Sequence, residues 1–341
     1  MRTASILPFT LISKLETTQM YDDHSINSAS EQRPGASRRS VILGAGATAV
    51  AAATTMAETA TAADKVETRE MEGKTAFITG GARGIGLSSA DLLARSGANI
   101  VIYDVARNLE HVDYDMSTEA DMAVAKAQIE AHGVQCMTVQ GDVRDRSGLV
   151  DAMQQATAVY GSLDHVLVNA GITQAGAIDS LGDESVQTVV DINIVGATRT
   201  IQAAVPIMQE QKSGSIVVIS SILGRRPNEW YSVYGASKWA VIGLAKATSL
   251  AMAPHSVTCN VICPTLVDTP LARSLAHMFN PQNPTWEAVE EVMRNINPLP
   301  VAAFQPEDVA QLVKFFASGS AKHITGEVFN LDAGSLAAAT V

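Results

Sequence analysis

The stretch GKTAFITGGARGIGLSSADLLARSGANIVIYD, residues 73–104, constrains the fold of this chain most strongly. An apolar strand is expected over 75–79, followed by a glycine-rich turn and an amphipathic helix with Ile85, Leu92 and Leu93 on one side. A second apolar strand closes the stretch. This order is typical of a βαβ unit, in which the two strands lie parallel in one sheet. The sequence therefore predicts an α/β fold.

The turn in this unit has the composition of a dinucleotide-binding loop. Gly80, Gly84 and Gly86 let the backbone turn tightly and let a pyrophosphate approach the helix N-terminus, where free N–H groups favour negative charge. Asp104, at the end of the second strand, is placed to accept hydrogen bonds from the adenosine ribose. Its carboxylate would repel a 2′-phosphate, which favours NAD. Because Arg83 could attract that phosphate, NADP remains the less favoured alternative.

Five further strands alternate with helices: QCMTVQGDV, LDHVLVNAG, SIVVISS, VTCNVICP and EVFNLDAG. This alternation predicts a Rossmann-type, doubly wound parallel sheet of seven strands in a single domain, residues 64–341. Ligands of such sheets bind at the carboxyl ends of the strands. Residues at these ends are therefore expected to contact the nucleotide: Asp142, Val143, Asn169, Ala170 and Gly171.

The segment YGASKWAVIGL opens a helix on which Tyr234 and Lys238 lie one turn apart on the same face. An ammonium beside a phenol favours the phenolate and lowers a pKa that is ordinarily about 10, as a general base for an alcohol proton requires. Such pairs also occur by chance on surface helices. The pair becomes a candidate catalytic site only together with the other motifs.

Taken together, TGxxxGxG, NAG, a strand ending in Ser220 and Ser221, and YxxxK resemble the short-chain dehydrogenase/reductase family over residues 73–335. The resemblance implies that Tyr234 is the acid/base and that Lys238 lowers its pKa and holds the nicotinamide ribose. It also implies that Ser221 orients the substrate oxygen, so that Ser221 and Tyr234 both contact the substrate. Ser220 is expected to be structural.

The same resemblance implies further site residues. Asn193, in DINIVGA, matches the water-relay asparagine of the family. Thr265 stands where the family usually has a glycine, a departure that is expected to reshape the local turn. The implied contacts to the nucleotide also include Ile85, Tyr234 and Lys238, and, after the sixth strand, Pro264, Val267 and Thr269.

The segment from about 270 to 297 lies where the family has its substrate lid, and it carries apolar residues at Leu271, Leu275, Met278, Phe279 and Trp286. Asn193, Ser221, Tyr234 and Lys238 together form the expected catalytic tetrad. Four apolar residues are expected near it: Ile222, Leu223, Trp230 and Trp239. A pocket with this lining is expected to prefer an apolar alcohol.

The link between Asp104 and Asp142 is longer than is usual in the family, and with the C-terminal segments it resembles the carveol dehydrogenase group. Members of that group include enzymes linked to the redox carrier mycofactocin. The resemblance implies that the link covers a tightly held NAD and that a redox carrier is a partner. An ordinary surface insertion is the alternative.

These features predict an NAD-dependent oxidoreductase that interconverts a secondary, terpenoid-like cyclic alcohol and its ketone. A hydroxysteroid dehydrogenase or a general carbonyl reductase would use the same residues, and a non-catalytic nucleotide-binding protein is the remote alternative. By resemblance to the family, a homotetramer is expected.

The first 63 residues differ in character from the rest. Residues 1–37 are polar and without periodicity, which predicts a disordered lead. The stretch SVILGAGATA has glycines but no amphipathic helix after them, so it is not expected to bind a nucleotide. Arg38 and Arg39, an apolar run and the small residues at 60–62 resemble a twin-arginine export signal. Export is therefore expected; a flexible tail on a cytoplasmic protein is the alternative. The apolar run is shorter than the roughly 20 residues of a membrane span.

Charge and cysteine content exclude other classes. The chain carries 24 Lys and Arg against 35 Asp and Glu, a net charge of −11, so no nucleic-acid partner is expected. Its cysteines, Cys136, Cys259 and Cys263, have neither metal-binding nor redox spacing. Buried free thiols and no metal are predicted.

Overall fold

The computed structural model describes residues 69–274, 276 and 284–338. The expected N-terminal lead and export signal, and three residues of the expected lid, Leu275, Met278 and Phe279, lie outside these ranges. The strands are β1 Thr75–Thr79, β2 Asn99–Asp104, β3 Cys136–Gln140, β4 His165–Val168, β5 Gly214–Ile219, β6 Val257–Pro264 and β7 Val328–Leu331. The α-helices are α1 Gly84–Arg95, α2 Glu119–Glu130, α3 Arg146–Tyr160, α4 Asp183–Val189, α5 Ala197–Gln211, α6 Ser232–Met252, α7 Pro270–Ser274, α9 Trp286–Ile296, α10 Pro306–Ala317 and α11 Ser335–Ala338.

Four short helical segments complete the described elements. A π-helix, η1, spans Val190–Gly196 and connects α4 directly to α5. The other three are 3₁₀ turns: η2 Ile222–Gly224, η3 Ala253–His255 and η4 Gly319–Ala321.

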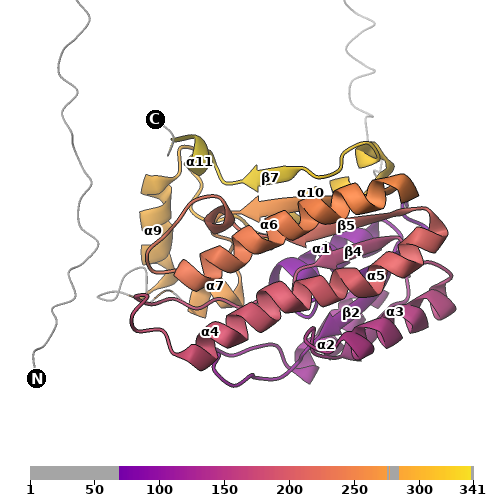
Figure 1. Ribbon diagram of the computed structural model, residues 1–341, viewed down its shortest axis with the longest axis horizontal. Coiled ribbons are helices and arrows are strands. Elements are labelled where there is room, and N and C mark those ends of the chain that lie inside the picture. The colour runs from indigo at the N-terminus through magenta and orange to yellow at the C-terminus, as the bar shows by residue number, and fades with distance from the viewer. Residues whose placement is uncertain (1–68, 275, 277–283, 339–341) are drawn as a thin grey trace, which may run out of the picture. The chain divides into compact units, whose positions relative to one another are not determined.

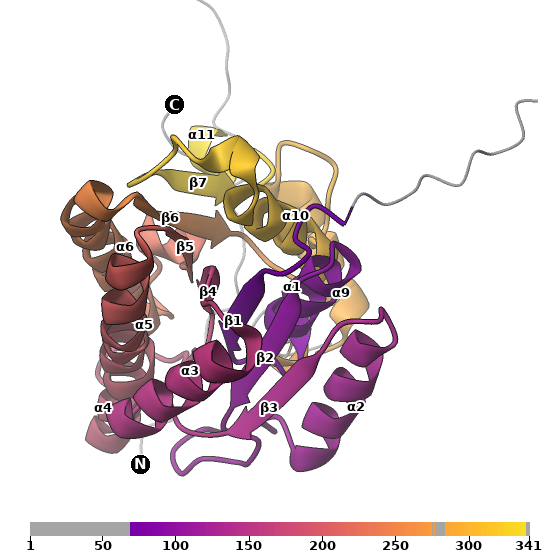
Figure 2. The ribbon, with the colours of Figure 1, turned by 90° about the vertical axis from the view of Figure 1, so that its right-hand side faces the viewer.

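The seven strands form one parallel sheet in the order β3-β2-β1-β4-β5-β6-β7 (Figure 1). Helices α1, α2 and α10 cover one face of the sheet, and α3, α5 and α6 cover the other (Figure 2). The direction of winding reverses between β1 and β4, the place where doubly wound sheets bind their ligands. The predicted fold class is confirmed.

Strand β1 illustrates why the strands read as continuous apolar runs. Ala76 and Ile78 lie in the apolar cluster on the α1 and α10 side, while Phe77 packs on the opposite side against Tyr103, with ring centroids 5.7 Å apart. All five β1 residues are buried, because helices cover both faces of the sheet. Burial of a side chain such as Phe77 contributes about 1.5–3 kcal/mol to the free energy of unfolding.

Cys136, Cys259 and Cys263 are all buried and free, as predicted. Within the described part of the chain, His, Cys, Asp and Glu residues form no group that could hold a metal ion. No helix in that part is both long and apolar enough to cross a bilayer.

Candidate active site

A cavity of about 390 Å³ lies at the carboxyl ends of the central strands. It brings together segments that are far apart in the sequence, from the glycine loop to the start of α7. Of the predicted site residues, Gly86 and Asn193 lie just behind the lining. The others line the cavity: Gly80, Arg83, Gly84, Ile85, Asp104, Asp142, Val143, Asn169, Ala170, Gly171, Ser221, Tyr234, Lys238, Pro264, Val267 and Thr269.

The loop between β1 and α1 requires its glycines for steric reasons. Gly80 and Gly84 have φ angles of +67° and +56°, in the left-handed region. A Cβ on Gly86 would lie 2.1 Å from the carbonyl oxygen of Gly80. The side-chain amide of Asn169 donates to the carbonyl oxygens of Thr79 and Gly80, both at 3.0 Å, and fixes the turn from β4. The loop is therefore rigid and leaves the N-terminus of α1 open to a phosphate group.

Asp104 ends β2 inside the cavity, but its carboxylate already has three protein donors. One oxygen accepts from the backbone N–H of Ala82 at 3.0 Å, and the other accepts from the N–H of Ala106 at 3.1 Å and from the hydroxyl of Ser117. Asp104 thus ties the glycine loop to the link that follows β2. Its expected bonds to a ribose remain a prediction.

The link between β2 and α2, residues 105–118, runs along the cavity and contributes six of its lining residues: Val105, Leu109, Tyr114, Asp115, Met116 and Ser117. Arg83 donates to the carbonyl oxygen of Asp115 at 3.1 Å and lies 3.9 Å from the Asp121 carboxylate. Tyr114 accepts a hydrogen bond from the backbone N–H of Thr173 at 3.1 Å. The link is therefore attached to both the glycine loop and the segment after β4.

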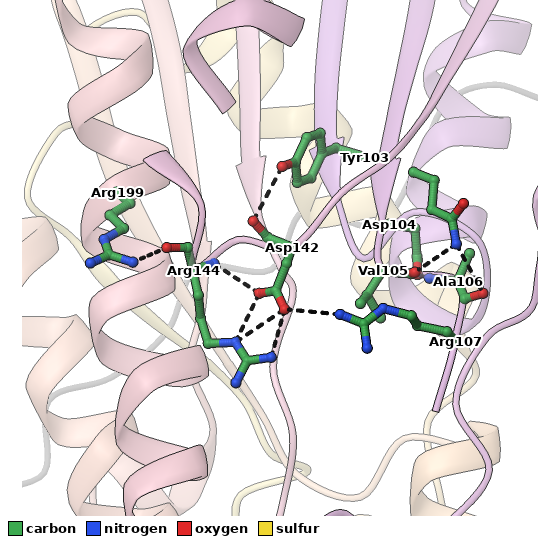
Figure 3. Close-up of polar contacts among 9 residues, drawn as sticks. Tyr103, Asp104, Val105, Ala106, Arg107, Asp142, Arg144 and Arg199 are labelled. Carbon is green, nitrogen blue, oxygen red and sulfur yellow. Dashed lines mark hydrogen bonds and ion pairs between the residues drawn. The ribbon is translucent and has the colours of Figure 1, made fainter. Parts of the chain in front are cut away.

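Asp142, after β3, lies between two arginines (Figure 3). Arg144 donates through Nη2 at 2.6 Å, and Nη2 of Arg107, from the link, lies 3.9 Å away. Burial acts to raise the pKa of Asp142, but the hydrogen bonds from Arg144 outweigh it and leave the pKa below its usual value. Asp142 is therefore ionised at neutral pH, and Arg107 provides another attachment for the link.

The catalytic candidates meet where α6 begins. Tyr234 and Lys238 lie on α6, and Ser221 caps η2, where its hydroxyl accepts from the N–H of Leu223 at 3.1 Å. The side chain of Ser221 acts on the phenol as a hydrogen-bond partner that lowers the pKa of Tyr234, so the two side chains lie next to each other. Ser220, by contrast, donates to the carbonyl oxygen of Lys238 at 2.8 Å, which is a structural role. The sequence pattern thus placed Ser221, rather than Ser220, beside the phenol.

The protonation of Tyr234 differs from the expectation. Burial raises the pKa of Tyr234 to about 12, against the lowering effect of its bond with Ser221, and burial lowers the pKa of Lys238 to about 8. The Lys238 ammonium lies 5.6 Å from the centre of the Tyr234 ring and donates to the carbonyl oxygen of Ile219. The prediction of a lowered pKa for Tyr234 is therefore wrong when only groups of the protein are considered. Burial removes both side chains from water and so disfavours the phenolate of Tyr234 and the ammonium of Lys238.

Asn193 lies in the π-helix η1 and is buried behind the residues that line the cavity. Its side-chain oxygen accepts from the N–H of Ile172 at 2.9 Å, and its amide donates to the carbonyl oxygen of Ile172 at 2.8 Å and to the Ser237 hydroxyl at 3.0 Å. A Cβ on Gly171 would lie 3.2 Å from this oxygen and 3.5 Å from Nζ of Lys238. Asn193 therefore joins η1 to the segment after β4 and to α6.

The segment after β6 forms another wall of the cavity. Pro264 ends the strand, and the N–H of Thr265 donates to the carbonyl oxygen of Leu331 on β7. Farther on, Arg273 of α7 forms an ion pair with Asp268 at 2.5 Å and lies 5.0 Å from the centre of the Trp286 ring at the start of α9. These contacts connect the described parts of the expected lid, α7 and α9.

Two expected apolar residues of the pocket are misplaced. Ile222 and Leu223 line the cavity, but Trp230 and Trp239 do not and are 38% and 52% exposed. Trp239 follows Lys238 on α6, so its side chain points about 100° away around the helix. The structure instead adds lining residues that sequence reasoning missed: Tyr114, Ile172, Thr173, Arg226, Tyr231, Leu266 and Met293. The unusual length of the link was the only signal for Tyr114.

Comparison with known proteins agrees with this geometry. The short chain dehydrogenase family matches residues 74–279. An uncharacterized oxidoreductase of Mycobacterium tuberculosis is 38% identical over 78% of this chain and 97% of its own length. The (-)-trans-carveol dehydrogenase of Rhodococcus erythropolis is 34% identical over 78% and 98%, respectively.

Among solved structures, carveol dehydrogenase from Mycobacterium avium in complex with NAD superposes with a TM-score of 0.76 at 33% identity, covering 79% of this chain and 99% of that one. The glycine loop, the tetrad and the cavity between them lie in the region that these comparisons cover. The chain belongs to the short-chain dehydrogenase/reductase family and is an NAD(P)-dependent alcohol oxidoreductase.

Proposed function

We propose that the protein is an NAD-dependent dehydrogenase that interconverts a secondary, apolar, terpenoid-like cyclic alcohol and its ketone. The observation that supports this most directly is that Ser221 and Tyr234 lie next to each other in a cavity shared with the glycine loop. Apolar side chains surround the pair on several elements, including Ile172, Ile222, Leu223, Leu266 and Met293. Such a lining favours an apolar substrate with one anchored oxygen.

Each tetrad member has a distinct task in this proposal. Tyr234 takes the proton of the substrate hydroxyl during oxidation and returns it during reduction. Ser221 holds the same substrate oxygen, which keeps it within reach of the phenol. Lys238 supplies positive charge, and Asn193 fixes the segment between Gly171 and Thr173 through its bonds to Ile172. Bound NAD would accept the hydride from the carbinol carbon.

The residues around the glycine loop fit a nicotinamide dinucleotide and favour NAD over NADP. The Asp104 carboxylate would repel a 2′-phosphate on the adenosine ribose, and its pairing with three donors keeps it fixed. Arg83, the one residue expected to attract that phosphate, is already bonded to Asp115 and lies close to Asp121. Both features support NAD as the cofactor.

The attachments of the link support a tightly held nucleotide. Arg83, Asp104, Asp142 and Thr173 each contact a link residue, and together they surround the cavity. A nucleotide beneath the link would leave only after several of these contacts break. A redox carrier would then be needed to reoxidise the cofactor in place, which makes such a carrier a proposed partner.

The outer face of α6 supports self-association. Trp239 and Leu250 are 52% and 79% exposed, and they lie on one side of the helix with the exposed residues Ala236, Gly243 and Ala247. An exposed apolar stripe of this kind commonly marks a protein interface. We propose a homotetramer, which light scattering after gel filtration would test.

Export by the twin-arginine route is a proposal that depends on Arg38 and Arg39. That route carries folded proteins, so a tightly held NAD would be loaded before export. Sequencing the N-terminus of the mature protein tests this proposal, since cleavage near residue 62 is expected.

The proposed activity is tested on protein whose bound nucleotide has first been identified. Denatured enzyme is expected to release NAD, and addition of cyclic terpenols to the native enzyme is expected to produce NADH absorbance. Steroid alcohols and simple aliphatic alcohols form the comparison panel. Faster oxidation of steroids than of terpenols would contradict the proposed substrate class and indicate a hydroxysteroid dehydrogenase. Release of NADP instead of NAD would contradict the proposed cofactor.

A further inference from the structure

Tyr114 and Thr173 meet on one wall of the cavity although they are 59 residues apart in the sequence. The backbone N–H of Thr173 donates to the Tyr114 hydroxyl oxygen at 3.1 Å. Both residues line the same cavity as Tyr234. Neither residue belongs to the glycine loop or to the catalytic tetrad.

Both side chains have hydrogen-bonding capacity that the protein does not use. Thr173 is only 6% exposed, and its hydroxyl has no partner among the described residues. The oxygen of Tyr114 accepts from Thr173, but no described residue accepts the Tyr114 proton. A buried polar group without a partner destabilises the folded protein, so such groups in a cavity wall indicate a polar group of a ligand.

The wall lies near the reacting centre. The charge of an ionised Tyr234 acts on Tyr114, and burial, the larger effect, raises the pKa of Tyr114 well above its usual value. Tyr114 therefore stays protonated and is a neutral hydrogen-bond donor. Thr173 is likewise neutral and can both donate and accept. Two neutral hydroxyls match an uncharged oxygen better than a carboxylate or a phosphate.

We propose that Tyr114 and Thr173 form a second polar subsite of the substrate pocket, which binds an uncharged oxygen of the substrate while the reacting alcohol lies at Ser221 and Tyr234. This inference rests on the proposed function and narrows its substrate class. The preferred substrates are cyclic alcohols that carry a second hydroxyl or a ketone, rather than ring alcohols with a single oxygen.

The test compares cyclohexanol with cyclohexane-1,2-, 1,3- and 1,4-diol as substrates of the NAD-loaded enzyme. A diol offers two hydroxyls for reaction, so a preference of twofold is only statistical. Wild-type enzyme is expected to show a kcat/KM for at least one diol about tenfold or more above that for cyclohexanol, because a site built for a hydroxyl rejects analogues that lack it.

Three variants assign that preference to the subsite: Tyr114→Phe, Thr173→Val and the double variant. Each is expected to reduce the diol preference, and the double variant to bring it to about the statistical factor, because at saturating NAD kcat/KM for the diol falls more than kcat/KM for cyclohexanol. Tyr160→Phe is the matched control, since Tyr160 ends α3 and does not line the cavity. Thermal denaturation identifies a variant that fails to fold, and Thr173→Val alone then decides the question.

A diol preference that survives in the double variant overturns the inference, as does a wild-type preference no greater than twofold. Weaker NAD binding by the variants with an unchanged diol preference would assign the two hydroxyls to the nucleotide and also overturn it. Failure of the proposed function has a different signature, because the wild-type enzyme would then bind NAD yet oxidise neither cyclohexanol nor any diol.

Discussion

The ammonium of Lys238 lies 5.6 Å from the centre of the Tyr234 ring, yet its nearest hydrogen-bond acceptor is the carbonyl oxygen of Ile219, at 3.1 Å. Lys238 is thus bonded to the backbone rather than to the phenol oxygen, and we expect its charge to act on the phenol through space. Burial raises the pKa of Tyr234 to about 12, so ionisation at working pH requires added positive charge in the cavity. Lys238 and the oxidised nicotinamide are the available sources.

Lys238→Met is therefore expected to lower kcat/KM for alcohol oxidation by about a hundredfold, the lower range for loss of one acid-base component. Since the phenolate is the active form, oxidation rises with pH until Tyr234 is ionised. The variant should shift this rise to higher pH, because the phenol loses a stabilising cation. A pH profile of kcat/KM measures the shift. An unchanged midpoint would remove Lys238 from the electrostatic role.

Gly86→Ala is expected to abolish nucleotide binding. The added Cβ would lie 2.1 Å from the carbonyl oxygen of Gly80, so the loop must move away from its present position. Gly319→Ala is the control, since nothing lies within 4 Å of a Cβ there. Isothermal titration with NAD compares the two variants. Nucleotide affinity within threefold of the wild-type value in Gly86→Ala would contradict the steric account.

Ser117→Ala is expected to speed nucleotide release. The hydroxyl of Ser117 donates to the buried carboxylate of Asp104 and ties the link to β2. Loss of a hydrogen bond to a charged group costs about 1.5–3 kcal/mol, which corresponds to a rate of release at least tenfold higher if the link must open. Stopped-flow displacement of NAD measures this rate, and Ser180→Ala, at an exposed turn, is the control. Equal rates in both variants would argue against the link as a cover.

The stability of the folded protein should depend on Asp91, a buried residue of α1 that accepts a hydrogen bond from Gln128 of α2. Burial acts to raise the pKa of Asp91, but hydrogen bonds from His132, Gln128 and Arg95 outweigh it and leave the pKa lowered. A carboxyl with a lowered pKa in the folded state stabilises the protein above its unfolded pKa of about 3.9, and this contribution disappears as the pH falls below that value.

Asp91→Asn is accordingly expected to reduce the free energy of unfolding by about 2 kcal/mol at pH 7. The difference from wild-type protein should shrink as the pH approaches 4 and vanish below the folded-state pKa. Urea denaturation between pH 7 and the acidic limit of this range measures the free energy of unfolding of the wild-type protein and of the variant. A difference that is independent of pH would show that Asp91 acts through packing rather than through its charge.

The fold could be predicted because the strands are predominantly apolar and alternate with turn and helix signals along the chain. Tyr234 and Lys238 could be placed together because they are one helical turn apart on α6. Ser221 could be placed near them because it follows the carboxyl end of β5. The pKa of Tyr234 could not be predicted in this way, because the cost of burial depends on residues from several segments. Trp239 was misplaced for a different reason, since its position directly after Lys238 on the helix was not followed around the helix to the outer face.

The link was the least predictable part. Its length was visible in the sequence, but its contacts join residues that are far apart in the chain: Arg107 with Asp142, Arg83 with Asp115, and Tyr114 with Thr173. No local period or motif encodes such contacts. The same holds for Asn193, whose motif was recognised while its bonds to Ile172 and Ser237 depend on the π-helical turn of η1.

The central claim is that the Tyr234 hydroxyl moves the substrate proton. The most direct measurement is NADH formation by Tyr234→Phe protein, with the bound nucleotide quantified in the same sample and cyclic terpenols as substrates. The account predicts nucleotide occupancy equal to that of the wild-type protein and a turnover rate at least about a hundredfold lower. A variant that holds its nucleotide and retains most of the wild-type rate would contradict the account.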